Sequence, residues 1–333
     1  MDWTEKLTTW YEGNRRDLPW RKTRDPYRVW ISEIMLQQTR VAAVIPYYER
    51  FLNELPSVQD LAIVPDDRLL KLWQGLGYYS RAWNLKKAAN EIVRRFKGSL
   101  PGTYRELLTL PGIGSYTAAA IASISFGERV PAVDGNVLRV YARLTGDYRD
   151  IADPHTKVSV FSELSAVMPD LAGTFNQAMM ELGATVCVPN GLPLCEKCPL
   201  ADRCRAKRNG LVADLPVKSK KALRSIEQMS VFLIRKDDSY LIRKRPATGL
   251  LAGLYELPNT EGHLNVNEAL SFVEACGIRP TGAITEYDRT HVFTHKEWHM
   301  HVFAFDTASP VPAGWLLYDG KQSVPTAFSI CLS

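Results

Sequence analysis

The chain lacks the long apolar runs and the strong charge excess that would assign it to a compartment or a partner. No segment of its 333 residues approaches the roughly 18 consecutive apolar residues of a membrane span. The segment from Met1 to Trp20 has no apolar core of the kind that a secretion signal requires. The formal net charge is only +5, which is weak evidence for a nucleic-acid partner. We therefore expect a cytoplasmic protein with no membrane partner.

Internal repeats and low-complexity segments are also absent from the sequence. Hydrophobic residues make up 46% of the chain and charged residues 23%, which excludes a disordered or fibrous protein. The length exceeds that of an average domain, so we expect two domains, each with its own core.

The alternation of apolar and polar residues that is typical of strands is nearly absent before position 208. Up to Lys207 the apolar residues recur at helical spacing, with breaks at pairs such as Pro111-Gly112, which predicts an all-α region over 1–208. Residues 209–225 are polar and lysine-rich, as in a linker or strap. Within 226–333, a strand, a turn and a second strand are predicted for MSVFLIRKDDSYLIRKRP. A helix ending at Gly277 is predicted for VNEALSFVEACGI, so this region is expected to be α+β.

Cysteines are few, but four of the six lie close together. Their spacing is Cys187-x7-Cys195-x2-Cys198-x5-Cys204. In a reducing compartment such clustering favours a metal site over disulfides. Four thiolates on a short loop suit either a tetrahedral zinc ion or a [4Fe–4S] cluster, and the spacing alone leaves both open.

The segment LPGIGSYTAA predicts a tight turn followed by a helix. Gly112 and Gly114 allow a turn with uncovered backbone N–H groups, and the helix N-terminus after them favours an anion. Such a turn can hold a DNA phosphate without regard to base sequence. The alternative is an ordinary glycine turn between two helices.

Several separated motifs together resemble one family. LPGIGSYTAAAI, then VPAVDGNVLRVYARL, then the four-cysteine loop resemble the helix–hairpin–helix glycosylases of the endonuclease III superfamily. SEIMLQQTRV, GLGYYSRA and FNQAMMELGA narrow the resemblance to the adenine DNA glycosylase (MutY) family, over the whole chain. The resemblance implies a six-helix barrel at about 22–130, an iron–sulfur domain from 1–21 and 131–208, and a Nudix-like domain at 226–333. It also implies a [4Fe–4S] cluster on the four cysteines, although this chain has seven residues between the first two where the family commonly has six.

The resemblance implies a monofunctional enzyme of base excision repair, which removes adenine mispaired with 8-oxoguanine or guanine from double-stranded DNA. Acid-assisted hydrolysis of the N-glycosidic bond requires one proton donor and one carboxylate that steadies the cationic sugar. Glu33 lies in the apolar stretch WISEIMLQQT, where burial would raise its pKa, and is expected to be the donor. Asp134 is expected to stabilise the sugar. At the start of a predicted helix it can equally be an N-cap, and the two roles can coexist.

Other site residues follow from the same comparison. Tyr116 stands where lyase relatives carry the Schiff-base lysine. It cannot form an imine, and we expect it to bond near the two acids. Gln38 and Tyr78 resemble residues that intercalate when the nucleotide leaves the stack. The remaining candidates near the intercalated step and around the adenine are Gln37, Thr39, Trp20, Arg21, Gln177 and Glu181. For Trp20 the alternative is a core residue, and for Glu181 a surface charge on a helix.

The C-terminal domain resembles a Nudix fold whose acidic metal motif is broken. Before Gly277 the sequence offers Glu274 with Ser271, too few carboxylates to hold magnesium on a diphosphate. The resemblance implies a reader of 8-oxoguanine, with Phe293, Thr294 and His295 as its recognition loop. The alternating histidines around this loop could form a metal site, but exposed surface residues are the more common case.

Two other functions stay open at this point. One is an endonuclease III-like lyase for oxidised pyrimidines, against which Tyr116 and the extra domain speak. The other is a non-catalytic DNA-binding protein with a structural metal loop, which the joint presence of Glu33 and Asp134 disfavours. We expect a monomer that associates with the nucleoid.

Overall fold

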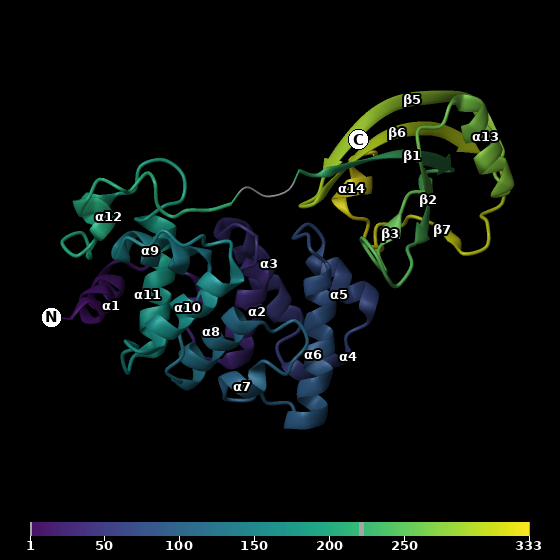
Figure 1. The fold of residues 1–333 in the computed structure, drawn as a ribbon. Coiled ribbons are helices and arrows are strands. Elements are labelled where there is room, and N and C mark those ends of the chain that lie inside the picture. Colours follow the sequence, from purple (N-terminus) through teal and green to yellow (C-terminus); the bar gives the residue numbers. More distant parts are fainter. Residues whose placement is uncertain (1, 220–222, 333) are drawn as a thin grey trace. The chain divides into compact units, whose positions relative to one another are not determined.

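The computed structural model describes residues 2–219 and 223–332, and their contacts divide the chain into two compact units (Figure 1). We call them the helical unit and the sheet unit. The helical unit is Met1–Ile63 with Trp83–Lys220, and the sheet unit is Val64–Ala82 with Lys221–Ser333. The segment 64–82, which the family resemblance assigns to the helical barrel, is thus grouped with the sheet unit. The other predicted domain boundaries stay predictions.

The predicted fold class, an all-α region followed by an α+β domain, is confirmed. The described residues of the helical unit contain no strand. Its elements are α1 (Trp3–Asn14), η1 (Pro19–Arg21), α2 (Pro26–Leu36), α3 (Val41–Glu54), α4 (Val58–Ile63), α6 (Ser80–Phe96, whose first residues belong to the sheet unit), α7 (Tyr104–Leu107), α8 (Ser115–Phe126), α9 (Gly135–Thr145), α10 (Pro154–Ser165), α11 (Ala172–Thr185), η2 (Cys195–Lys197) and α12 (Arg205–Arg208). No helix among the described residues is long and apolar enough to cross a membrane.

Local capping sets where several of these helices begin and end. The side chain of Asp2 caps α1 as part of a capping box, and Asp25 caps α2 directly before a proline at the first helical position. Gly127 and Gly146 end α8 and α9 with φ values of 75° and 70°, in the left-handed region that favours glycine. The helix boundaries that matter for the site are therefore local properties of the sequence.

Helix α8 lies in the middle of the helical unit and contacts both α2 and α11. Its residues from Thr117 to Ser123 are all buried, and most of them are alanine or another small residue. Small side chains let neighbouring helices approach closely. As a result, residues at the start of α8 lie near side chains from both α2 and α11.

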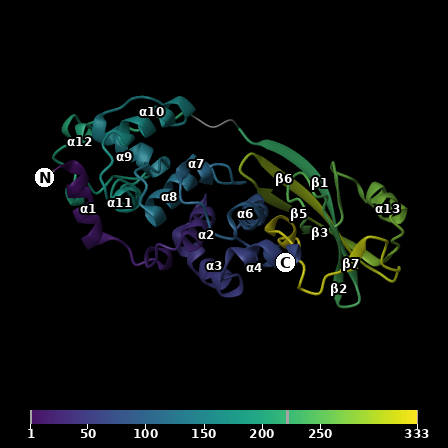
Figure 2. The same ribbon diagram turned by 90° about the horizontal axis from the view of Figure 1, so that it is seen from below.

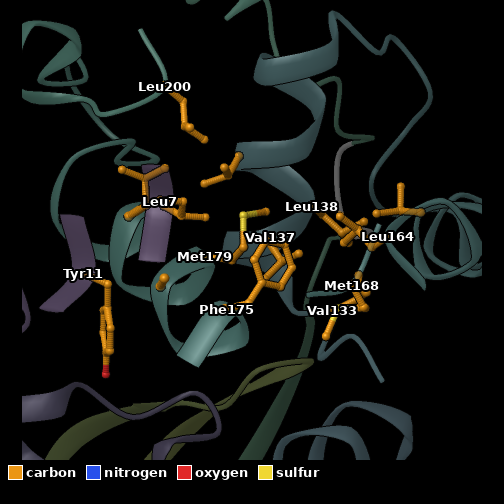
Figure 3. Close-up of a cluster of buried hydrophobic side chains, with 14 of the residues drawn as sticks. Leu7, Tyr11, Val133, Val137, Leu138, Leu164, Met168, Phe175, Met179 and Leu200 are labelled. Atoms are coloured by element: carbon orange, nitrogen blue, oxygen red, sulfur yellow. The ribbon is translucent and has the colours of Figure 1, made fainter. Parts of the chain in front are cut away.

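A hydrophobic cluster joins α1, α9, α10 and α11 (Figure 3). Leu7, Phe175 and Met179 are at most 1% exposed within it. Gly183 lets α11 approach α9, because a Cβ at this position would lie 2.6 Å from the Cβ of Asn136. This packing fixes the start of α9, and with it Asp134, against α11.

The sheet unit contains a seven-stranded sheet with the order β3-β2-β1-β6-β5, in which β4 also pairs with β1 and β7 with β2. Strands β1 and β6 are parallel, and β5 is antiparallel to β6. Its elements are α5 (Asp66–Trp73), β1 (Ser225–Lys236), β2 (Ser239–Lys244), β3 (Tyr255–Glu256), β4 (Asn259–Glu261), α13 (Val266–Ala275), β5 (Pro280–Val292), β6 (Lys296–Thr307), β7 (Trp315–Leu317) and α14 (Thr326–Ser329).

Both faces of the sheet are covered in its central part. Helix α13 lies beside the sheet (Figure 2). On this face, Phe232 and Phe303 pack with Val273 of α13. Val231 and Val302 pack with Phe328 of α14 on the other. Strand β1 is therefore buried on both sides, which explains the unbroken apolar run in its sequence. The predicted strand–turn–strand and the helix before Gly277 are both confirmed.

Candidate active site

A cavity of about 860 Å³ lies in the helical unit. Its lining comes mainly from η1, α2, α8, α9 and α11 and the turns that follow them. The structure brings together most of the residues that the sequence predicts for the site. Those in the lining are Trp20, Arg21, Glu33, Gln37, Gln38, Thr39, Tyr116, Asp134, Gln177 and Glu181.

Glu33 is a buried carboxyl group on α2. Only 7% of the residue is exposed, and its helix neighbours Trp30, Ile31 and Ile34 are buried apolar residues. Burial raises the pKa of Glu33 to about 7, with a hydrogen bond from Tyr116 acting in the opposite direction and the charge of Asp134 adding to the rise. Near neutral pH this group can therefore both hold and release a proton.

Tyr116 is the second residue of α8 and lies beside Glu33. Its hydroxyl lies 2.9 Å from the sulfur of Met180, and it is also hydrogen-bonded to the Glu33 carboxyl. Burial raises the pKa of Tyr116 well above 10, and the charges of Glu33 and Asp134 contribute. The phenol therefore stays neutral and can donate a hydrogen bond within the cavity.

Asp134 caps helix α9 and also lines the cavity. Its carboxylate accepts from the backbone N–H of Val137 at 2.7 Å and from the side-chain amide of Asn136 at 2.8 Å. Burial raises the pKa of Asp134, and these two donors act against the rise. The capping interpretation is thus confirmed, and it coexists with a place in the same cavity as Glu33.

Glu181 is held in the cavity wall by two arginines. It is fully buried, and its carboxylate accepts from Arg16 and from Arg21, each with a closest distance of 2.6 Å. Burial alone would raise the pKa of Glu181, but hydrogen bonds from Arg16 and Arg21 lower it to about 2. Glu181 is therefore a fixed anion, and the alternative of a surface charge on a helix is wrong.

Trp20 and Gln177 contribute to the cavity and to packing at once. Trp20 is 8% exposed, and its ring meets that of Tyr48 edge to face at 5.4 Å. The side-chain oxygen of Gln177 accepts from the hydroxyl of Tyr11 at 3.1 Å. Both side chains are therefore held rigidly where they line the cavity.

The turn after α2 brings Gln37, Gln38 and Thr39 to the cavity. The side-chain amide of Gln37 donates to the hydroxyl of Thr117 at 3.3 Å. Gln38 is exposed and has a φ of 56°, a left-handed conformation that is uncommon outside glycine. Such strain is found preferentially at functional sites.

Tyr78 and the predicted recognition loop belong to the sheet unit. Tyr78 is 42% exposed, and like Gln38 it is a non-glycine residue with positive φ, here 49°. Its hydroxyl is hydrogen-bonded to that of Thr294. Thr294 and the exposed His295 form the turn between β5 and β6, while Phe293 packs edge to face on Trp298 at 4.9 Å. The turn is thus anchored by one aromatic ring and presents polar groups at its tip.

The glycine turn before α8 has the predicted form. Gly112 has a φ of 73°, and a Cβ there would lie 2.5 Å from the Cβ of Asn84, so a larger residue is excluded. Gly114 caps α8 and has open space beside it. Among the described residues, no acceptor is recorded for the backbone N–H of either exposed glycine. These donors remain available to an anion.

The four cysteines line one pocket, together with apolar residues such as Val186 and Val212. Burial raises the pKa of Cys198 to about 11, so four thiolates require a positively charged group between them. Arg143 donates to the sulfur of Cys187 at 3.3 Å. Within the described residues, no three Cys, His, Asp or Glu side chains are grouped so as to hold a single metal ion.

The cysteine loop borders the catalytic cavity. Pro189 and Asn190, which follow the first cysteine, belong to the cavity lining. Arg139 is 7% exposed and donates to the carbonyl of Cys187 at 2.7 Å and to the side-chain oxygen of Asn136 at 2.8 Å. Asn136 in turn bonds Asp134, so a continuous set of hydrogen bonds runs from the first cysteine to the carboxylate.

Sequence reasoning missed Arg16, Asn136 and Arg139, which all line the cavity. Asn136 and Arg139 lie within five residues of Asp134 in the motif AVDGNVLRV, so the motif itself carried a signal for them. Nothing near Arg16 in the sequence pointed to Glu181, which lies 165 positions away.

The histidines of the sheet unit do not form a metal site in the part of the chain described here. The expectation of exposed residues holds for His295 but is wrong for His301, whose side chain is 16% exposed. Its ring nitrogens lie 2.7 Å from Asp288 and 3.0 Å from Glu286. His301 therefore contacts the carboxylates of two β5 residues, Glu286 and Asp288.

The chain matches two known families. Residues 31–163 match the HhH-GPD superfamily of base excision DNA repair proteins, and residues 230–329 match the NUDIX domain. The first match contains Glu33, Tyr116 and Asp134. The second covers most of the sheet.

Among curated proteins, the chain is 35% identical to an adenine DNA glycosylase of Mus musculus, over 94% of this chain and 73% of that protein. It is 33% identical to an adenine DNA glycosylase of Buchnera aphidicola subsp. Baizongia pistaciae, over 90% of this chain and 83% of that protein. These alignments extend through both units.

Two solved structures resemble the helical part. A thermostable thymine-DNA glycosylase matches with a TM-score of 0.56 at 29% identity, over 62% of this chain and 95% of that chain. A non-covalent endonuclease III–DNA complex matches with a TM-score of 0.53 at 25% identity, over 62% of this chain and 94% of that chain. Together with the arrangement of the cavity, the relatives show that this chain is a DNA glycosylase of base excision repair and belongs to the adenine DNA glycosylase family.

Proposed function

We propose that this enzyme removes adenine mispaired with 8-oxoguanine or guanine from double-stranded DNA, by hydrolysis and without efficient strand cleavage. The observation that carries the proposal is the meeting of Glu33, Asp134 and Tyr116 in one cavity. Two carboxyl groups with different surroundings supply the acid and the anion that the reaction requires.

Glu33 is the proton donor in this proposal. Its pKa of about 7 leaves it partly protonated at neutral pH. The proton passes to a ring nitrogen of adenine, and the bond between the sugar and the base then breaks with both electrons leaving on the purine. Water adds to the cationic sugar carbon, and the Glu33 carboxylate accepts the proton that this water loses.

Asp134 stabilises the positive charge that develops on the sugar. The donors Asn136 and Val137 hold its carboxylate in place and favour the ionised form. A fixed anion in a partly desolvated cavity stabilises a nearby cation more strongly than water would. Tyr116 donates its hydrogen bond beside both acids and keeps Glu33 oriented.

The adenine itself is held at the wall formed by Trp20, Arg21, Gln177 and Glu181. Glu181 fixes the side chains of Arg21 and Arg16, which both line the cavity, in a defined geometry. Gln38 and Tyr78 fill the gap that the extruded nucleotide leaves in the DNA stack, and Phe293, Thr294 and His295 recognise 8-oxoguanine. Gln38 and Tyr78 are both exposed and have a left-handed backbone, a strain that is found preferentially at functional sites and supports this assignment.

A [4Fe–4S] cluster is held by Cys187, Cys195, Cys198 and Cys204. Support comes from the four thiols around one pocket, its apolar shell and the Arg143 donor to sulfur, which suit a cluster of this charge. When bound, the cluster supplies the positive iron centres that keep the thiols ionised. The loop between the first two cysteines then keeps Pro189 and Asn190 at the cavity. A purified protein with brown colour and about four irons per chain agrees with this assignment, whereas colourless protein with one zinc contradicts it.

The test of the function is a single-turnover assay on a duplex with one adenine opposite 8-oxoguanine. We expect adenine release, with strand scission only after hot alkali, because tyrosine at position 116 cannot form an imine. Glu33→Gln and Asp134→Asn should each slow release by on the order of 100-fold or more. Scission without alkali would favour an endonuclease III-like lyase. Tight binding with no product would favour a non-catalytic protein.

A further inference from the structure

Residues 215–219, which we call the strap, lie within the predicted linker but are fixed on the helical unit. Leu215 is 1% exposed, and its carbonyl accepts from Arg143 at 2.8 Å. The carbonyl of Val217 accepts from the backbone N–H of Ile151 at 3.0 Å. At the far end, the N–H of Ser219 donates to Asp150 at 3.2 Å, and its hydroxyl bonds the same carboxylate. The strap is therefore held on both sides of Lys218.

Lys218 and Pro216 of the strap line the catalytic cavity. The other cations of the lining already have partners: Arg16 and Arg21 bond Glu181, and Arg139 bonds backbone carbonyls and Asn136. Lys218 is exposed, and no ion pair or hydrogen bond of its ammonium group is recorded within 2–219 and 223–332. Apart from the influence of its charge on Asp150, this ammonium group thus has no partner among the described residues, and its backbone is fixed at the cavity.

We propose that Lys218 binds a phosphodiester of the nucleotide whose base enters the cavity. The proposal rests on the function proposed above. An extruded nucleotide brings its own phosphates to the mouth of the cavity, where an ammonium group is an effective point-charge partner. Because the strap is held before DNA arrives, little backbone ordering opposes the contact. Lys218 is a positioning residue in this scheme.

The same amine could in principle attack the sugar carbon after the base has left. That reaction requires an unprotonated amine, which enzymes obtain by burying the lysine or placing it beside another cation. Lys218 is exposed. Its charge contributes to the lowered pKa of Asp150, which is due mainly to the hydrogen bond from Ser219. Exposure is the opposite of such burial, and we therefore assign Lys218 to phosphate binding.

The test uses the full chain and measures binding without chemistry. The probe is a duplex with a stable abasic analogue opposite 8-oxoguanine, and Kd is measured over a salt series. Loss of one phosphate contact lowers the slope of log K against log salt by about 0.9, which we expect for Lys218→Gln. Lys218→Arg should keep the slope. The matched control is Lys321→Gln, which removes the same charge from a side chain that is 87% exposed in the sheet unit, and it should also keep the slope.

Neutral methylphosphonates at single positions around the abasic analogue locate the contact. At one position, a methylphosphonate in the DNA should weaken binding by the wild-type protein and by Lys321→Gln. The same methylphosphonate should cause no further loss of affinity in Lys218→Gln. If Lys218 has only a structural role, the affinity losses from the methylphosphonate and from Lys218→Gln should add, and the slope of log K against log salt should stay unchanged. Either result overturns the proposal. The proposal also fails if borohydride traps a covalent adduct between the enzyme and the natural abasic product, and if Lys218→Gln abolishes this adduct. If the enzyme releases no adenine at all, the proposed function fails, while the salt slopes still decide the role of Lys218.

Discussion

Each unit of this protein contains a buried glutamate that is hydrogen-bonded to two arginines. Among the described residues, the helical unit alone has a second buried glutamate, Glu33, which is not bonded in this way. Glu181 accepts from Arg16 and Arg21. In the sheet unit Glu256 is 4% exposed and accepts from Arg243 at 2.7 Å and from Arg245. Glu33 is also buried, with 7% exposed, but no arginine is hydrogen-bonded to it among the described residues, and its pKa is raised to about 7. In the helical unit, burial with two arginines thus makes Glu181 a fixed anion, whereas burial without them makes Glu33 an acid.

The sheet unit matches the NUDIX domain, but its described residues offer few carboxylates where a Nudix hydrolase needs them. Where a Nudix hydrolase collects carboxylates, Glu274 is exposed and the hydroxyl of Ser271 donates to the carbonyl of Asn267 within α13. The described residues contain no group of three metal ligands. What the unit does present is the tip of the β5–β6 turn, with Thr294 and His295 exposed. This difference supports the proposed function, with the chemistry in the helical unit and the recognition of 8-oxoguanine in the sheet unit.

The largest effect is expected for Glu181→Gln, which removes the carboxylate that Arg16 and Arg21 share. Glu181→Gln leaves two cations without a buried partner, which should cost about 3 kcal/mol of unfolding free energy at pH 7. It should also slow adenine release by on the order of 100-fold, because a misplaced adenine reacts poorly. Chemical denaturation and single-turnover kinetics measure the two effects.

The matched control is Glu256→Gln in the sheet unit. It should cost a similar unfolding free energy, with the rate of release at saturating enzyme kept within about threefold, since this pair touches no reacting group. The folded-state pKa of Glu181 lies below its unfolded value, so its stabilisation is present above about pH 4.5 and is lost as the pH falls toward 2. The comparison fails if Glu181→Gln loses as much unfolding free energy at pH 3 as at pH 7, or if Glu181→Gln and Glu256→Gln lose adenine release to the same extent.

The helices, the glycine turn and the strands could be predicted from the sequence because each depends on local patterns. Asp134 at a helix start, Gly112 in the turn and the apolar run of β1 are examples. The grouping of Glu33, Tyr116 and Asp134 in one cavity was expected only through the family resemblance. No periodicity reveals it, since these residues come from three helices whose packing is a tertiary property.

The residues that sequence reasoning missed or left open depend on distant partners. Whether Glu181 is a surface charge or a buried anion is decided by Arg16, far away in the chain. In the sequence, Lys218 is one lysine of a polar linker. Its place at the cavity depends on hydrogen bonds of its neighbours, in which Leu215 and Val217 accept from Arg143 and Ile151, and Ser219 donates to Asp150. Such pairings carry no local signal.

A smaller effect is expected at Glu33, the buried acid of the helical unit. The folded-state pKa of Glu33 lies above its unfolded value, so the folded protein loses stability as the pH rises from about 4.5 to about 7. Glu33→Gln removes this loss, and it should therefore stabilise the protein at pH 8 by at most about 3 kcal/mol relative to pH 4.5. Thermal unfolding of both proteins across this range measures the difference. A stability difference independent of pH would mean that Glu33 is not the buried acid of the cavity.

The smallest effect is expected at the tip of the sheet unit. The Thr294 hydroxyl is exposed and hydrogen-bonded to Tyr78 in the absence of DNA, so it is a polar group free to exchange that partner for 8-oxoguanine. Thr294→Ala should lower the preference for 8-oxoguanine over guanine opposite adenine by about fivefold, the value of one hydrogen bond near 1 kcal/mol. The ratio of single-turnover rates at subsaturating enzyme on the two duplexes measures this preference. Thr294→Ser keeps the hydroxyl and should keep the ratio, because the added methyl group takes no part in the bond. If both variants lower the ratio equally, the side chain acts by packing, and recognition must lie with Phe293 and His295.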